Sequence, residues 1–267
     1  MKFKLFAFCL LITSQASGLA ALAPLCSSVL PIYLVMEESV SSDSPRPGKY
    51  DSIIGRELCK KILAKYVTYD PHDYILDGVC PVIDGFNLLA TTPTGSGKTG
   101  FFTLFMLVVR EIAADKTLAI GNEVFPIDPV MIVVCPTKAL EEDIVGLVIT
   151  NDRMLLTLAK ATQSREVGLT AIVINSDTVN LARKSKRNIW QEAIKGFTMV
   201  MVSPEELASR DFNQLLGVKE FWDRIFALGV DEVHLLYFWG ALFRPNYRRI
   251  GYLRERLPMS CTRSLPR

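Results

Sequence analysis

The sequence predicts an α/β domain in which a mostly parallel, twisted sheet carries helices on both faces. Apolar runs of strand length alternate with helical stretches along most of the chain, and that alternation is typical of parallel strands joined by crossover helices. A glycine-rich loop stands between one such strand and one such helix, and an acidic pair ends another strand. The chain has 267 residues, of which 49% are hydrophobic, and this is enough for a core of that kind.

The expected elements follow from the apolar pattern. Helices are predicted over 52–67 and 73–84, where apolar residues recur at helical spacing. The apolar stripe of the first helix consists of Ile53, Ile54, Leu58, Ile62 and Leu63. Strands are predicted near 87–91, 130–135, 170–174, 198–202 and 225–230. The polar segment 177–195 is predicted to form an amphipathic surface helix whose apolar anchors are Val179, Leu181, Ile189, Trp190 and Ile194.

Residues 1–36 differ from the rest of the chain. Lys2 and Lys4 precede the apolar run 5–12, which is the arrangement of a secretory signal, and small residues at 16–18 or 21–23 offer a cleavage site. The second apolar run, 29–36, is shorter than the roughly 20 residues that cross a bilayer. Two interpretations stay open: a hydrophobic leader of no export function, such as a wrongly joined exon, and a working signal. Residues 37–50 are the expected linker into a domain at 51–258.

A phosphate-binding loop is predicted after the strand at 87–91. Its residues are Thr92, Pro93, Thr94, Gly95, Ser96, Gly97, Lys98 and Thr99. Glycines let backbone N–H groups approach phosphate oxygens, and the positive end of the following helix lies at the same point. Lys98 is placed to reach the β- and γ-phosphates, and the Thr99 hydroxyl is placed to ligate Mg²⁺. The pattern therefore predicts a site for a nucleotide with Mg²⁺.

An acidic pair, Asp231 and Glu232, follows the apolar strand at 225–230. The carboxyl ends of parallel strands meet at one edge of a sheet, which places the pair beside the phosphate loop. We expect Asp231 to hold Mg²⁺ through water and Glu232 to orient the attacking water, so that Glu232, Asp231 and Lys98 form the catalytic set. His234 lies too far along to reach the γ-phosphate first, and we expect it to couple the site to a neighbouring surface.

These motifs together resemble the superfamily-2 helicases of the DEAD/DEAH type. Residues 239–258 have the pattern W-G-x-x-F-R-P-x-Y-R-x-x-G-x-L-R-x-R-x-P, which resembles the RecQ branch. Residues 133–140 and 201–207 resemble two further motifs of the family. Thr92 stands where the general phosphate-loop pattern has glycine, and this fits a helicase-type loop better than a small-molecule kinase. The resemblance covers roughly residues 45–258, which is most of the chain.

The resemblance implies a RecA-like P-loop NTPase domain that uses ATP and Mg²⁺. It also implies binding of single-stranded or forked DNA, 3′-5′ polarity, work in DNA repair or recombination, and a nuclear or other intracellular location. The residues that match nucleic-acid contacts are Pro136, Thr137, Lys138, Ser203, Pro204, Trp239, Phe243 and Arg244. Aromatic faces stack on bases and arginine pairs with phosphate. Core packing of Trp239 and Phe243 stays open as an alternative.

Two departures from the family pattern bear on function. Family members carry a glutamine that reads adenine at the position held here by Ile75, and isoleucine cannot make the paired amide contacts. Residues 259–267 show no periodicity and are expected to be an unstructured tail, where the pattern expects a Thr-Ala-Thr-like motif and then a second motor domain. An arginine finger from such a domain is worth on the order of 10³–10⁵ in turnover. We therefore expect an ATP-binding domain that is weak or inactive alone, with a non-enzymatic or decayed fragment as the alternative.

The charge and the cysteine content restrict the kinds of binding site that the chain offers. The formal net charge is +2, so basic character is local: residues 183–187 suit a solvated helix face, whereas the arginines within 244–256 alternate with aromatic residues and suit a bound strand. The six cysteines contain no C-x-x-C pair, which disfavours a zinc site or a disulfide framework. No stable membrane contact is expected, and the sequence does not indicate an oligomeric state.

Overall fold

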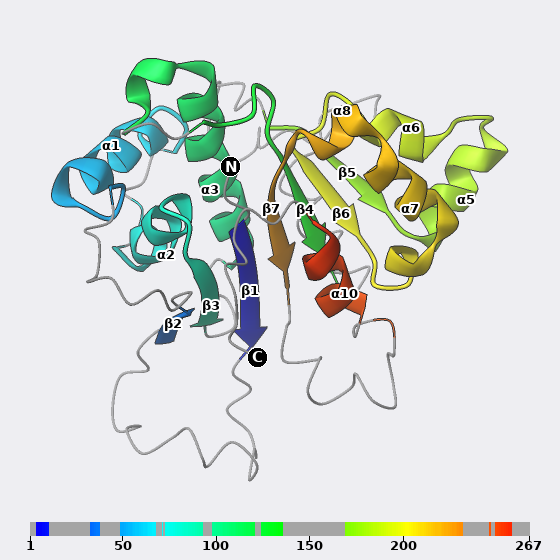
Figure 1. The fold of residues 1–267 in the computed structure, drawn as a ribbon, viewed down its shortest axis with the longest axis horizontal. Helices are drawn as coiled ribbons and strands as arrows, with labels where there is room; N and C mark the ends of the chain where they lie inside the picture. Colours follow the sequence, from blue (N-terminus) through cyan, green and yellow to red (C-terminus); the bar gives the residue numbers. More distant parts are fainter. Residues whose placement is uncertain are drawn as a thin grey trace, which may run out of the picture.

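The computed structural model describes residues 4–10, 33–37, 49–67, 71, 73–92, 98–120, 124–135, 169–231, 246 and 249–257. Within these ranges the strands form one sheet in the order β2-β3-β1-β7-β4-β6-β5 (Figure 1). The strands are β1 (Lys4–Leu10), β2 (Tyr33–Glu37), β3 (Asn87–Thr92), β4 (Val130–Val134), β5 (Ala171–Ile174), β6 (Met199–Val202) and β7 (Ile225–Val230). All neighbours pair in parallel except β2, which runs antiparallel to β3 at the edge.

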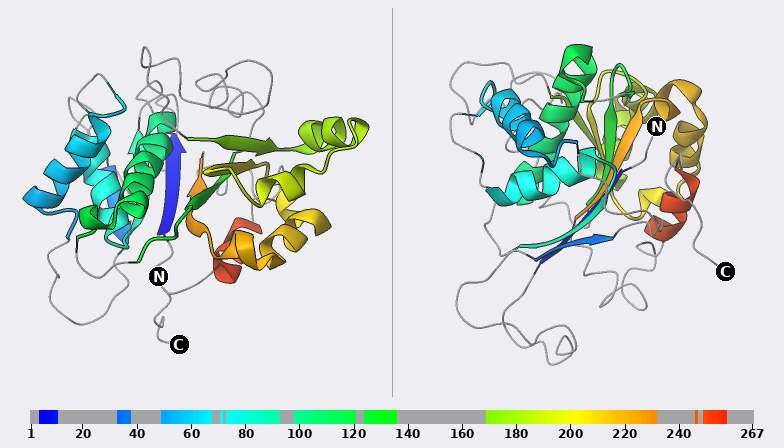
Figure 2. Two further views of the ribbon diagram at one scale, coloured as in Figure 1. Left: turned by 90° about the horizontal axis from the view of Figure 1, so that it is seen from above. Right: turned by 60° about the vertical axis from the view of Figure 1, so that its left-hand side comes forward.

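Helices cover both faces of this sheet, which confirms the predicted fold class. They are α1 (Ile53–Leu63), α2 (Asp73–Ile83), α3 (Lys98–Ala114), α5 (Ser176–Lys184), α6 (Ile189–Ala193), α7 (Arg210–Gly217), α8 (Lys219–Trp222) and α10 (Arg249–Arg256), with the short 3₁₀ turns η1 (Lys116–Leu118) and η2 (Glu206–Ala208). Helices α1, α2 and α3 lie on one side of the sheet, and α7, α8 and α10 lie on the other (Figure 2).

The two cores follow from the alternation of side chains along each strand. In β4, Met131 and Val133 belong to the core that contains the buried residues of α1, α2 and α3. Val130, Ile132 and Val134 belong to the core that contains those of α7 and α10. All five side chains are buried, as is typical of a parallel strand that helices cover on both faces.

Helix α3 has the longest run of buried residues on the first face. Residues 101–109 are all buried, in line with the predicted apolar helix, and the ring of Phe105 stacks on Phe226 with centroids 6.1 Å apart. A Cβ atom on Gly229 would lie 2.7 Å from Met131 Cε and 2.8 Å from Phe102 Cε1. The glycine therefore lets α3 come close to β7, and the helix reaches across from β3 to that strand.

Capping groups and one buried arginine organise the second face. The side chain of Asn175 accepts hydrogen bonds from the N–H groups of Asp177 and Thr178, both at 3.0 Å, at the start of α5. Arg224 is 9% exposed and donates to three carbonyls, those of Asp128, Ile194 and Phe197. Its guanidinium also pairs with the Asp128 carboxylate at 2.8 Å. Burial lowers the pKa of Arg224, while the charge of Asp128 opposes that change.

The predicted strands at 87–91, 130–135, 170–174, 198–202 and 225–230 are confirmed to within a residue or two, but two helix faces differ from prediction. Ile53 and Ile54 are 85% and 79% exposed, because α1 begins at Ile53 and its first turn packs through Gly55, whose added Cβ would lie 2.4 Å from Tyr50 Cα. The segment 177–195 forms two helices instead of one, separated by a turn in which Lys186 has φ 56°. Leu181, a predicted apolar anchor, is 56% exposed.

Strand β1 comes from residues 1–36, which the sequence analysis set apart from the domain. Its backbone pairs with β3 from Phe6↔Leu88 to Leu10↔Thr92, and with β7 from Lys4↔Ala227 to Ala7↔Val230. The strand therefore lies inside the sheet (Figure 1). Among the described helices, none combines the length and apolar content that crossing a bilayer requires.

Candidate functional site

The expected site residues follow the carboxyl ends of the parallel strands, which all lie at one edge of the sheet. Thr92 is the last residue of β3 and Lys98 is the first residue of α3. Residues 93–97 thus connect the end of a strand to the amino end of a helix of 17 residues. That is the strand, loop and helix order in which backbone N–H groups and the helix dipole attract an anion.

Asp231 lies at the same edge, immediately after β7. It is 2% exposed, and its backbone N–H donates to the carbonyl of Val134 at 3.0 Å, which continues the pairing of β7 with β4 by one residue. A carboxylate at this depth must be compensated by hydrogen bonds or a cation. Carboxylate oxygen is also the ligand type that Mg²⁺ prefers. The burial of Asp231 therefore fits the metal role expected from the sequence.

The register of β1 relates the two strand ends to each other. Ala7 is the partner of both Leu89 and Val230, so these two residues lie at one level with a single strand between them. Neighbouring strands are about 4.8 Å apart, which places β3 and β7 roughly 10 Å apart. Asp231 lies just beyond that level, and Thr92 lies further along in the same direction. Strand β1 fills the sheet between them as far as Leu10, the partner of Thr92, so a bound metal ion and phosphate would lie beyond the end of β1.

Five of the expected nucleic-acid residues, at 136–138 and 203–204, follow β4 and β6, on the far side of β7 from β3. Cys135, which precedes the predicted contact at 136–138, is buried, and its N–H donates to the carbonyl of Val202 at 3.2 Å. Ser203 and Pro204 are also buried, and Ser203 is 9% exposed. Its N–H donates to Ile174 O at 3.1 Å. These two side chains thus present little surface, and their contact with nucleic acid stays a prediction.

Several predicted site residues fall outside the described ranges. They are Pro93, Thr94, Gly95, Ser96, Gly97, Pro136, Thr137, Lys138, Glu232, His234, Trp239, Phe243 and Arg244. For Thr92, Lys98 and Thr99 the structure describes the backbone. What it does establish is that the segments carrying the phosphate loop, the acidic pair and the two nucleic-acid motifs all start from one edge of the sheet.

Ile75, which replaces the glutamine expected from the family pattern, is part of the first core. It lies in α2 and is 5% exposed. An aliphatic side chain buried there offers no hydrogen bond to an adenine edge. Sequence reasoning missed a different feature of the site, the end of β1 between the two strands that carry it. The only signal was the apolar run 5–12, which has the same composition in a signal and in a buried strand.

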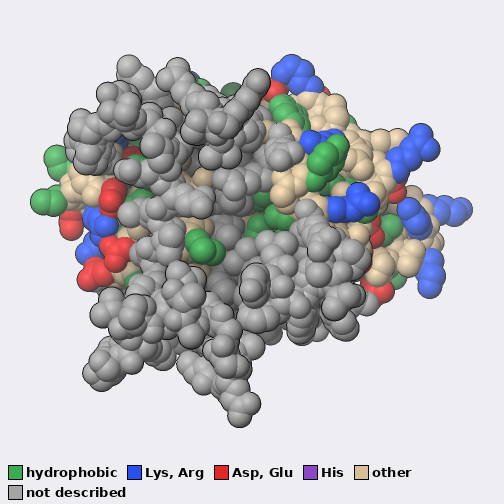
Figure 3. Space-filling model, turned by 60° about the horizontal axis from the view of Figure 1, so that its bottom comes forward, with side chains coloured by type: hydrophobic (Ala, Val, Ile, Leu, Met, Phe, Trp, Pro, Cys, Tyr) green, Lys and Arg blue, Asp and Glu red, His purple; other side chains and the backbone are tan. Residues whose placement is uncertain are grey.

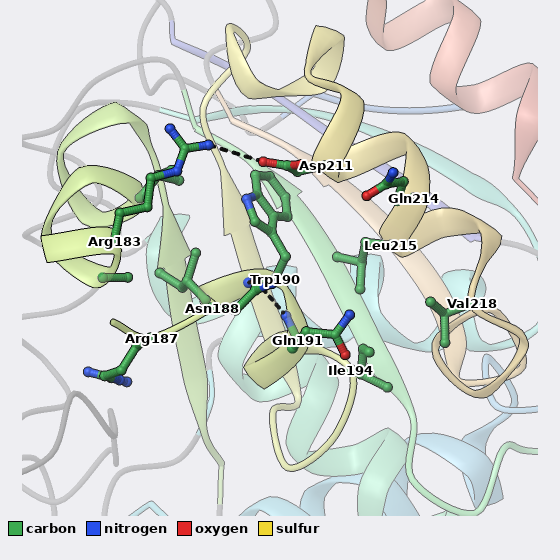
Figure 4. Close-up of a pocket in the computed structure, with 13 residues that line it drawn as sticks. Arg183, Arg187, Asn188, Trp190, Gln191, Ile194, Asp211, Gln214, Leu215 and Val218 are labelled. Atoms are coloured by element: carbon green, nitrogen blue, oxygen red, sulfur yellow. Dashed lines mark hydrogen bonds and ion pairs between the residues drawn. The ribbon is translucent and has the colours of Figure 1, made fainter. Parts of the chain in front are cut away.

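A separate pocket of about 180 Å³ lies between α5, α6 and α7 (Figure 4). Its arginines already have carboxylate partners: Arg183 pairs with Asp211 at 3.2 Å, and Arg187 Nε donates to Glu192 at 2.8 Å. Trp190 Nε1 is buried there without a hydrogen-bond partner among the described residues. Described Lys and Arg side chains gather over this end of the molecule (Figure 3). Since the two arginines are paired, the pocket does not suit a triphosphate.

Comparison with known proteins identifies the family. Residues 77–265 match the model of the DEAD/DEAH box helicase family. The chain belongs to this family. An ATP-dependent DNA helicase Q1 from Rattus norvegicus is 27% identical over 154 residues, covering 57% of this chain and 22% of the rat protein. An ATP-dependent DNA helicase RecQ from Haemophilus influenzae is 27% identical over 88 residues, covering 32% of this chain and 14% of that protein.

A mouse ATP-dependent DNA helicase Q1 gives a similar match, with 28% identity over 160 residues that cover 57% of this chain and 21% of the mouse protein. The chain thus spans about a fifth or less of the length of these relatives. The similarity to RecQ helicases confirms the RecQ-like resemblance. The family implies use of ATP and binding of nucleic acid.

Proposed function

We propose that this chain is the ATP-binding motor domain of a RecQ-like DNA helicase, with ATP and Mg²⁺ at the ends of β3 and β7. The single observation that carries the proposal is geometric. The strand that leads into the phosphate loop and the strand that ends at buried Asp231 finish at the same edge of the sheet, one strand apart. Residues 51–258 are the proposed extent of the helicase motifs.

Each residue of the nucleotide site has a distinct proposed role. The backbone of 93–97 and the amino end of α3 hold the phosphates, and Lys98 neutralises charge on the β- and γ-phosphates. Thr99 and Asp231 are the residues that would hold Mg²⁺, which supplies charge stabilisation on the phosphate oxygens when bound. Glu232 would orient and polarise the water that attacks the γ-phosphate. Asp231 is 2% exposed, and this burial supports its proposed role in holding Mg²⁺.

The nucleic-acid surface is proposed on the β4 and β6 side of the same edge. The strands that precede 136–138 and 203–204, β4 and β6, lie on the other side of β7 from the phosphate-loop strand β3, and this supports the proposal. Trp239, Phe243 and Arg244 follow the acidic pair in the chain and would stack on bases and pair with phosphate. Single-stranded or forked DNA, 3′-5′ polarity and an intracellular location are proposed from the similarity to DNA helicases named Q1 and RecQ.

Hydrolysis by residues 1–267 alone is expected to be slow. In related NTPases an arginine finger raises turnover by on the order of 10³–10⁵, and the sequence pattern of 1–267 does not match the second motor domain that would supply it. ATP binding and ATP turnover are therefore separate questions. DNA-stimulated turnover at helicase-like rates would contradict the slow hydrolysis proposed here and leave the binding site intact.

Buried Ile75 favours a second candidate, a non-enzymatic nucleic-acid-binding or nucleotide-binding fragment. Without a glutamine at this position, the base is not held by paired amide contacts. If nucleotide binding is retained, ATP and GTP should bind with affinities within about threefold, because the phosphate loop does not contact the base. A marked preference for ATP would show that other groups read adenine.

The proposal is tested by titrating the full chain with a fluorescent ATP analogue in the presence of Mg²⁺. Lys98→Ala should weaken binding by about 100-fold, since charge-assisted contacts to phosphate are lost. Lys116→Ala is the matched control, because Lys116 is exposed on η1 and should leave affinity unchanged. Equal affinity for the wild-type chain and Lys98→Ala would reject the proposed site.

A further inference from the structure

We propose that β1 is a permanent structural strand of this domain and that residues 1–10 are retained, not removed as part of a secretory signal. In this role the strand joins the phosphate-loop strand β3 to the acidic strand β7 and fixes their spacing. The inference rests on the proposed function only in the experiments that measure nucleotide binding. The structural role of β1 is inferred from the pairing of the strands alone.

The topology gives β1 a central position. In the described sheet, β3 pairs with β2 and β1, and β7 pairs with β1 and β4. No pairing joins β3 to β7 directly among these strands. Without β1, the ladder would separate into one part that leads to the phosphate loop and another part that leads to Asp231 (Figure 1).

The neighbours of β1 are not suited to be free edges. Leu88 and Ala90 of β3 are 2% and 1% exposed, and every residue of β7 is buried. Leu89 of β3 is 37% exposed, but the backbone N–H and C=O groups of fully buried β7 need partners, because water does not reach them to replace a lost ladder. A strand that is paired on both sides satisfies these groups, and residues 4–10 do so in parallel register.

The register also sets the geometry of the nucleotide site. Cys9 and Leu10 pair with Thr91 and Thr92, so β1 runs alongside β3 up to the point where the phosphate loop begins. Its other edge pairs with β7 up to Val230, next to Asp231. If β1 left, β3 and β7 would either stay apart with unpaired edges or close up by about 4.8 Å, one strand spacing. Both outcomes would misplace the phosphate loop relative to Asp231.

Helix α3 provides a second connection that acts on the same two strands. It starts at the end of the phosphate loop, and Phe102 on this helix packs where Gly229 of β7 has no side chain. Seen from above, α3 and β1 lie side by side (Figure 2). Helix α3 covers one face of the sheet at this point, and β1 lies in the sheet between β3 and β7.

The composition of residues 4–10 explains why the sequence alone left their role open. KLFAFCL is an apolar run after a basic start. Such a run is found both in the apolar part of a signal peptide and in a parallel strand buried on both faces. Cleavage at either small-residue site, 16–18 or 21–23, would remove β1 entirely. A chain from which such a signal had been cleaved could therefore not form the sheet described here.

A disulfide cross-link tests the register without use of any ligand. Thr91→Cys places a thiol opposite Cys9, its register partner, and the Cα separation of about 4.8 Å between paired strands suits a disulfide. The matched control is Ala90→Cys, whose side chain points to the opposite face because faces alternate along a strand. Mild oxidation and peptide mapping should give the 9–91 link in the first variant and no link to Cys9 in the second. Absence of the 9–91 link, or equal linking in both variants, overturns the proposal.

Deletions test the consequence for stability and binding. A chain that lacks residues 2–10 should lose cooperative unfolding, or unfold at least about 10 °C lower, and bind the ATP analogue at least tenfold more weakly. The matched control lacks residues 259–267, the same number at the other end, and should behave as the full chain. An unchanged unfolding temperature after loss of 2–10 overturns the proposal.

The two proposals can fail separately. If the 9–91 disulfide forms in the Thr91→Cys variant but the full chain binds no ATP analogue, β1 stands and the nucleotide site is rejected. Intact-mass analysis of the chain carrying a C-terminal tag, expressed in cells with a secretion pathway, adds a direct readout. We expect the mass of the chain with residues 2–10 present, and a mass that starts after residue 18 or 23 would reject retention.

Discussion

The two faces of the sheet are built in different ways. On the first face, α3 has a run of nine buried residues, 101–109, and aromatic rings meet across it, such as Phe125 and Phe226 at 5.4 Å between centroids. On the second face, the helices have 4 to 9 residues, and polar side chains cap the starts of α5, α6 and α7. Ser209 accepts from the N–H of Phe212 at 3.0 Å at the start of α7.

The difference shows where each face obtains its rigidity. A long helix that is buried on most sides is positioned by apolar packing, which fixes the amino end of α3, where the proposed phosphate loop joins it. Short helices have little intrinsic stability, and the second face depends on caps and on the Arg224 contacts to three carbonyls. The predicted nucleic-acid segments follow strands β4 and β6 in the chain, whereas α3 directly follows the proposed phosphate loop. Three substitutions compare the two faces.

The largest effect is expected for Phe102→Ala on the first face. The ring is 1% exposed and packs at the joint between α3 and Gly229. Its loss removes buried apolar area and leaves a cavity, which should lower the free energy of unfolding by about 3–5 kcal/mol. Urea denaturation measures this change. Ile53→Ala on the same face is the control, because Ile53 is 85% exposed and should cost less than about 0.5 kcal/mol. Similar losses for both would mean that α3 packs less tightly than described.

An intermediate effect is expected for Arg224→Met on the second face. The methionine keeps the apolar stem and leaves the carbonyls of Asp128, Ile194 and Phe197 without their shared donor. The free energy of unfolding should fall by about 2–4 kcal/mol. In the control Arg187→Met, the pair with Glu192 is lost, but the Arg187 side chain is 53% exposed and the cost should stay below about 1 kcal/mol. Equal stability of the two variants would mean that the Arg224 hydrogen bonds do not stabilise the second face.

The smallest effect concerns Glu111 at the end of α3, and it depends on pH. Burial opposes the charged form, but hydrogen bonds from Lys65 and Tyr66 outweigh it and lower the pKa of Glu111. Burial and Glu111 in turn raise the pKa of Tyr66 to about 12. A carboxyl group whose pKa is lowered by folding stabilises the fold above its unfolded pKa, and this stabilisation is lost as the pH falls through the folded value.

Glu111→Gln should therefore lower the free energy of unfolding by about 1 kcal/mol at pH 7, a value kept small because Lys65 is 56% exposed. The difference from wild type should shrink as the pH falls below 4.5, the ordinary value for this group. Urea denaturation at pH 7 and pH 3.5 checks this. Asp223→Asn removes the exposed pair with Lys219 and should change stability by less than about 0.5 kcal/mol at both pH values. A constant deficit for Glu111→Gln would mean that its charge is not the cause.

Local patterns predicted much of the fold because each depends on residues close in the chain. Alternation of apolar runs predicted the parallel sheet and its main strands, and the loop before Lys98 predicted where α3 begins. The same reasoning misplaced Ile53, Ile54 and Leu181, which are exposed. Helical spacing alone does not tell which part of an apolar stripe meets the sheet, since that depends on where the helix begins and what lies beside it.

The amino-acid sequence by itself determined the α/β class and predicted a phosphate-loop segment and a catalytic acidic pair, because each pattern is written in contiguous residues. Only the tertiary structure decided that Asp231 is buried at the edge shared with Thr92, and that residues 4–10 separate β3 from β7. Strand pairing depends on which free edge a segment meets in space. A strand of seven mostly apolar residues carries no information about a partner more than two hundred positions away in the chain, and only the assembled sheet determines that partner.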